Sequence, residues 1–127
     1  MIWHETGHAY NFYLRSTGSR FDLEWGVLSK NTYTTKAHYE ADPNYPKDGI
    51  LSGYGSRNQL EDVAVYVEAV YGRLKLPESY YQTFFERAMA TNDSRFKAKI
   101  ELLRKYGIIS EDDYQKFREL VQLDSWK

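Results

Sequence analysis

The 127-residue chain contains no cysteine and only three prolines, and it has no apolar run long enough to span a membrane. Without cysteine there can be no disulfide, no thiolate nucleophile and no cysteine-ligated zinc, so a metal would need His, Asp or Glu ligands. The formal net charge is only -1, which gives no electrostatic reason to expect binding to nucleic acid or to an anionic membrane. Tyrosine is plentiful, with twelve residues, and the length fits a single domain over residues 1–127.

The pattern of apolar residues, caps and helix breakers predicts a mainly α domain. A first helix is expected from about Ile2 to Arg15, and four further helical segments follow: 59–71, 77–90, 92–107 and 110–123. Gly72 is placed just past the end of the helix over 59–71. Residues 16–57 are punctuated by glycine and proline and are predicted to be a long irregular loop, in which WGVLS (25–29) could form one short strand.

The stretch HETGH, His4 to His8, indicates a zinc site. Residues four apart share one face of a helix, so His4 and His8 can direct two imidazoles at one ion, while Glu5 can reach a water in the ion's open position. A metal lowers the pKa of that water and a carboxylate can take its proton, which is the H-E-x-x-H arrangement of metalloproteases. The alternative is a solvated pair of histidines. Gly7 favours a packed helix, because glycine inside a helix costs about 1 kcal/mol relative to alanine and therefore indicates a close contact.

A catalytic zinc requires a third protein ligand. The metzincin pattern is excluded, because Asn11 and Leu14 stand where it requires Gly and His. His38 could ligate only if the predicted loop folds back. Glu61 is the better candidate, since it opens a helix that is apolar nearly all round, and a buried carboxylate needs a compensating partner. Glu61 also fits the first turn of a helix capped by Asn58, so the residues alone leave both roles open.

HETGH followed by YGSRNQLEDVA resembles the gluzincin metallopeptidases of the anthrax lethal factor-like kind. In that pattern HExGH lies on one helix and a Y-x(6)-E segment opens the next active-site helix. The resemblance covers about half of the chain, with a gap between the two motifs. It implies that Glu61 is the third zinc ligand beside His4 and His8. It also implies that Glu5 is the general base, and that the hydroxyl of Tyr54 steadies the oxyanion of the tetrahedral intermediate.

The sequence departs from the family pattern one turn after the third ligand. The family often has a second acidic residue there, and this chain has Val65. Asp62 or Glu68 could orient a histidine instead, and Asp62 is also an alternative third ligand.

The resemblance also implies a β-sheet before the HExxH helix, whose edge strand would hold the substrate. Only three residues precede His4, so we expect a zincin-like catalytic domain truncated at its N-terminus: a fragment, a late start or a natural short form. The protein would be secreted if an upstream signal segment is missing, and the sequence itself indicates neither compartment nor oligomeric state.

The expected function is a zinc-dependent metallopeptidase that acts on a peptide or protein. Three alternatives to an active enzyme remain. The chain could be a metal-stabilised helical interaction module, or an inactive fragment of a metallopeptidase. It could also be a partner-binding bundle without metal, in which one apolar set forms an interaction patch: Leu102, Leu103, Tyr106, Ile108 and Ile109.

Overall fold

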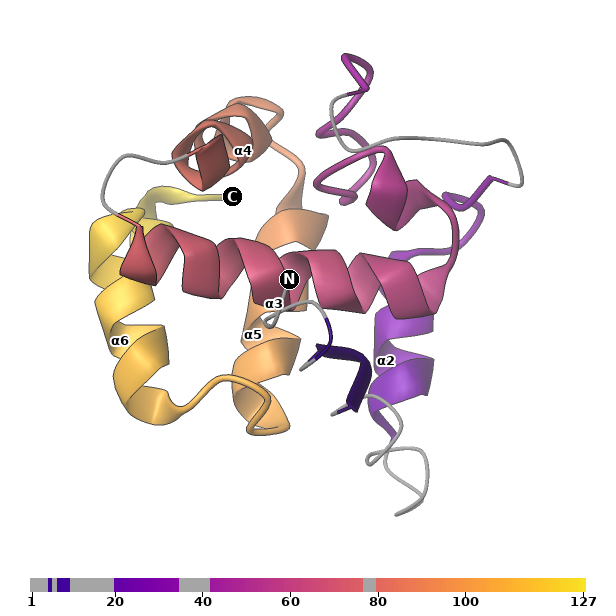
Figure 1. Ribbon diagram of the computed structural model, residues 1–127. Helices are drawn as coiled ribbons and strands as arrows, with labels where there is room; N and C mark the ends of the chain where they lie inside the picture. The colour runs from indigo at the N-terminus through magenta and orange to yellow at the C-terminus, as the bar shows by residue number, and fades with distance from the viewer. Residues whose placement is uncertain (1–4, 6, 10–19, 35–41, 77–79) are drawn as a thin grey trace.

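The computed structural model describes residues 5, 7–9, 20–34, 42–76 and 80–127. These ranges are mainly helical (Figure 1), and the named elements are α2 (Phe21–Leu28), η1 (Tyr54–Ser56), α3 (Gln59–Lys75), α4 (Tyr80–Ala90), α5 (Ser94–Lys105), α6 (Glu111–Leu120) and η2 (Leu123–Ser125). No strand occurs in them apart from an isolated bridge between Lys47 and Ile50. The mainly α prediction is confirmed. None of the described helices is both long enough and apolar enough to cross a membrane.

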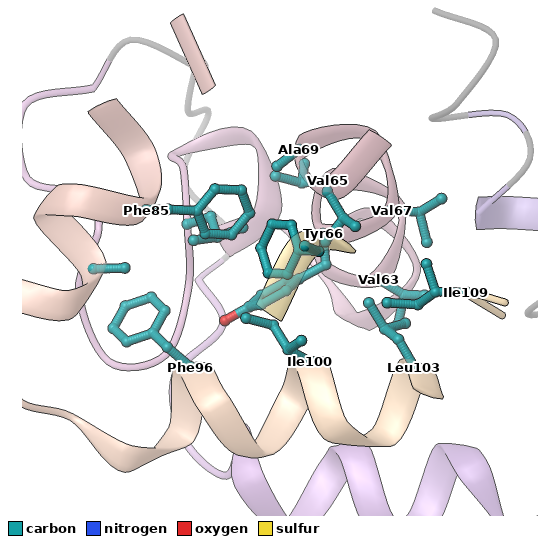
Figure 2. Packing of buried hydrophobic residues seen from close by; sticks show 14 of the residues in the cluster. Val63, Val65, Tyr66, Val67, Ala69, Phe85, Phe96, Ile100, Leu103 and Ile109 are labelled. Carbon is teal, nitrogen blue, oxygen red and sulfur yellow. The ribbon is translucent and has the colours of Figure 1, made fainter. Parts of the chain in front are cut away.

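Helix α3 is the centre of the fold, and the other helices lie around it (Figure 1). Every residue from 62 to 70 is buried, as predicted for a helix that is apolar nearly all round. Figure 2 shows Val63 and Tyr66 of α3 directed at the apolar stripe of α5. The residues of this stripe are fully buried: Phe96, Ile100 and Leu103.

Side-chain caps mark the starts of the last two α-helices. The Ser110 hydroxyl accepts a hydrogen bond from the backbone N–H of Asp113 at 3.1 Å, and Asp93 caps α5 in the same way through Arg95. The predicted helix over 77–90 is described from Tyr80 onward, because residues 77–79 lie outside the described ranges.

The apolar set considered as an interaction patch belongs to the core. Leu103, Ile108 and Ile109 are at most 2% exposed, while Leu102 and Tyr106 are partly buried and pack against the same cluster. Leu103, Ile108 and Ile109 are thus not free for a partner, and the Tyr106 ring packs edge-on against Phe21 of α2. The alternative in which this set forms an interaction patch is therefore wrong for Leu103, Ile108 and Ile109.

Gly72 does not end α3, contrary to prediction, because the helix continues to Lys75. The glycine is required by packing: a Cβ at this position would lie 2.3 Å from Cδ2 of the Tyr81 ring. Gly72 therefore allows α4 to approach α3, and its role is not that of a helix terminator.

Residues 25–29 form no strand, because Phe21–Leu28 is the helix α2. Its apolar residues alternate with others in sequence, which imitates the period of a strand. The structure uses a different period: Phe21 and Trp25, four apart, are buried, whereas Leu23 and Val27 between and beyond them are exposed. The segment predicted as one long irregular loop thus contains a packed helix.

Candidate metal centre

The HETGH segment is described at Glu5, Gly7 and His8, which are helical as predicted. It lies beside α3, as Figure 1 shows for the indigo segment. His4, one predicted ligand, lies outside the described residues, and so does His38 of the loop.

The side chains of His8 and Glu61 meet, although 53 positions separate them in the sequence. His8 Nε2 lies 2.6 Å from Glu61 Oε1, which is hydrogen-bonding distance. The two side chains are only 20% and 13% exposed. The fold therefore brings together two of the three side chains predicted as zinc ligands.

Gly7 explains how the two helices come close enough for this contact. A Cβ on Gly7 would lie 2.8 Å from Cα of Ala64 and 3.2 Å from Cβ of Val67. Both contacts are on α3, and the first is to its backbone, which cannot turn aside. The prediction that Gly7 marks a close helix contact is confirmed.

The His8–Glu61 pair fits a zinc ion chemically. It offers one imidazole nitrogen and one carboxylate oxygen, a donor set that zinc accepts. Two such atoms bound tetrahedrally to one zinc lie roughly 3.4 Å apart, given metal–ligand bonds of about 2.1 Å. The observed pair would have to separate by less than about 1 Å, which side-chain rotation can supply. Among the described residues no group of three His, Cys, Asp or Glu side chains could hold a metal. His4, the predicted third ligand, is not among the described residues.

Glu61 had two possible roles, as a first-turn residue of a capped helix and as a zinc ligand, and both are compatible with the structure. Its backbone N–H donates to Asn58 Oδ1 at 2.9 Å, so Asn58 caps α3. Its carboxylate is directed instead to His8. Capping uses the main chain of Glu61 and leaves its side chain available for the site.

Tyr54 begins η1, the short helix that packs against α3 just before the turn that carries Glu61. Its ring is partly buried, and the Arg57 guanidinium lies over it, 5.0 Å from the ring centroid. The structure thus places Tyr54 next to α3, the helix that carries Glu61.

Asp62, the alternative ligand, directs its carboxylate into the core. Its Oδ2 accepts hydrogen bonds from Lys99 Nζ at 2.7 Å, Tyr33 Oη at 2.6 Å, Trp25 Nε1 at 2.9 Å and Ser29 Oγ at 3.4 Å. We call these five residues the Asp62 cluster. Burial and the charge of Asp62 raise the pKa of Tyr33, which keeps its hydroxyl protonated as a donor.

Lys99 is the residue that the sequence interpretation missed. It is completely buried on α5, and burial lowers its pKa while Asp62 opposes that shift. A signal was present: Lys99 stands three residues after Phe96, on the apolar stripe of its helix. A lysine at such a position requires a buried anion, and Asp62 supplies it.

Glu68, the other proposed orienting residue, is also buried and accepts a hydrogen bond from the Tyr81 hydroxyl at 3.1 Å. This bond joins α3 to α4 and stabilises the same contact that Gly72 permits.

Comparison with known proteins finds no matching family model, no matching curated protein and no matching solved structure.

Proposed function

We propose that the chain is a zinc-dependent metallopeptidase of the gluzincin type, with His4, His8 and Glu61 as the metal ligands. The observation that carries the proposal is the contact between His8 and Glu61, 2.6 Å apart. Two motifs that were matched separately in the sequence are brought to one place by the fold. A chance HExxH match has no reason to face the glutamate of a second motif.

The remaining residues have distinct chemical roles in this proposal. Zinc, when bound, supplies a Lewis acid that polarises the scissile carbonyl and acidifies water. Glu5 takes the proton of the attacking water and later delivers it to the leaving amine. Tyr54 donates a hydrogen bond to the developing oxyanion, an interaction that is strongest in the transition state. Gly7 and Asn58 hold the two helices and the ligand-bearing turn in place.

The contact between His8 and Glu61 also supports the proposal that the domain is zincin-like. The HETGH segment and α3 would be the two active-site helices of a zincin-like domain, with η1 placing Tyr54 beside them. The support for this is the close approach at Gly7 and the position of η1 directly before α3.

Metal removal tests the function directly. We expect the zinc-loaded chain to cleave members of a mixed peptide library, detected by mass spectrometry. Cleavage should fall to background after chelator treatment and return when about one equivalent of zinc is added. Hydrolysis that is unaffected by the chelator would contradict the proposal. Zinc that raises the melting temperature without any cleavage would instead indicate the non-catalytic, metal-stabilised module.

A further inference from the structure

Lys99 joins the two segments that carry Glu61 and Tyr54. Its Nζ donates to Asp62 Oδ2 at 2.7 Å and to the backbone oxygen of Gly49 at 3.0 Å. Asp62 directly follows Glu61 on α3, and Gly49 stands five residues before Tyr54. One buried ammonium group therefore bonds to the chain on both sides of the stretch from Tyr54 to Glu61.

The surrounding contacts make this bridge a rigid one. The ammonium of Lys99 lies over the rings of Trp25 and Tyr66, 5.2 Å and 5.6 Å from their centroids. Trp25 also donates to Asp62, which ties α2 to the first turn of α3. Glu61 and Asp62 are consecutive residues of one continuous helix. Holding the side chain of Asp62 therefore fixes how α3 is rotated about its axis, and with it the direction in which Glu61 points.

The Asp62 carboxylate, which Lys99 contacts, also lies close to η1. A Cβ on Gly55, the residue after Tyr54, would lie 3.5 Å from Cα and 3.6 Å from Oδ1 of Asp62. Oδ1 is buried and has no hydrogen-bond partner among the described residues. The backbone that carries Tyr54 therefore packs against the same carboxylate that Lys99 holds.

Stability alone is a weak reason for such a pair. Burying two charges carries a desolvation penalty that their attraction barely offsets, and apolar replacements of buried ion pairs are often neutral or stabilising. What a buried pair supplies well is a single defined arrangement of the elements that it joins.

We propose that the Lys99–Asp62 ion pair positions the metal site, by fixing Glu61 and Tyr54 relative to each other without contacting the metal or the substrate. This inference rests on the proposed function, since it concerns the same site.

The test compares zinc affinity in the parent chain and in the neutral double variant Asp62→Asn/Lys99→Met. The Asn oxygen still accepts from Trp25 and Tyr33, and the Tyr66 hydroxyl still holds Gly49 O at 2.7 Å, so the variant should fold. We expect the zinc dissociation constant, measured by competition with a chromophoric chelator, to rise about tenfold, at the low end of what partners of metal ligands contribute. With zinc saturating, kcat should still be reduced and KM unchanged.

Leu103→Ala is the matched control on α5. It loosens the same helix interface from a fully buried position but leaves the Asp62 cluster intact, so zinc affinity should be unchanged. An unchanged affinity in the folded double variant, or an equal loss in Leu103→Ala, would overturn the inference while leaving the proposed function intact. Should the double variant not fold, Lys99→Met alone leaves Asp62 three hydrogen-bond donors, Trp25, Tyr33 and Ser29, and is also expected to weaken zinc binding; an unchanged constant there overturns the inference. A parent chain that binds no zinc overturns both proposals.

Discussion

Replacing Glu5 with glutamine is expected to reduce peptide hydrolysis about 10³-fold while the chain keeps its zinc. Glutamine has nearly the same shape as glutamate but cannot accept the proton of the attacking water. Glu5 is helical and exposed, so the substitution removes no packing from the core. The measurement is the rate of cleavage of one peptide from the library, together with the zinc content of the same sample.

Glu119→Gln is the matched control, since Glu119 is equally exposed on a helix far along the chain, in α6. It should cleave at the parent rate. A Glu5→Gln variant that cleaves as fast as the parent would show that the base is another group and that the mechanism is wrong.

Replacing Gly7 with alanine is expected to weaken zinc binding by at least about tenfold. The added Cβ would lie 2.8 Å from the backbone of α3 at Ala64, so the two helices must separate and carry His8 away from Glu61. Two effects on stability compete. Alanine favours the helix by about 1 kcal/mol, whereas overpacking costs about 1–3 kcal/mol. We therefore expect a net loss of at most about 2 kcal/mol in the free energy of unfolding, but a clear loss of metal affinity.

The control for this variant is Ala9→Gly. Ala9 is exposed on the same helical segment, so this change lowers helix propensity without altering the contact with α3. It should destabilise the chain by about 1 kcal/mol and leave zinc affinity nearly as in the parent. Zinc affinity that is unchanged in Gly7→Ala would mean that the close approach of the helices does not set the distance between the ligands.

Most of the helical framework could be predicted from the sequence, because its signals are local. The caps at Asn58 and Ser110 and the apolar stripe of α5 each depend on residues within one or two turns. Helix α2 could not be recognised in this way. Its alternating apolar residues imitate a strand, and only packing against α5 decides between the two periods.

In the candidate site, too, features that depend on neighbouring residues could be predicted, and contacts between distant segments could not. The spacing within HETGH and the distance from Tyr54 to Glu61 are visible in the sequence. The pairing of His8 with Glu61 followed only from a family resemblance, because it depends on how two helices cross. The Lys99–Asp62 pair was missed for the same reason: each residue has its partner on another helix, 37 positions away. Gly72 was misinterpreted because the Tyr81 ring that requires it belongs to α4.

The most direct test of the central claim is the zinc content of the purified chain beside that of a Glu61→Gln variant, measured by elemental analysis. Glutamine keeps the backbone N–H that Asn58 caps but removes the negative charge that a zinc ligand provides. The account predicts about one zinc per chain in the parent and little or none in the variant. A parent without zinc, or a variant that retains as much zinc as the parent, would contradict it.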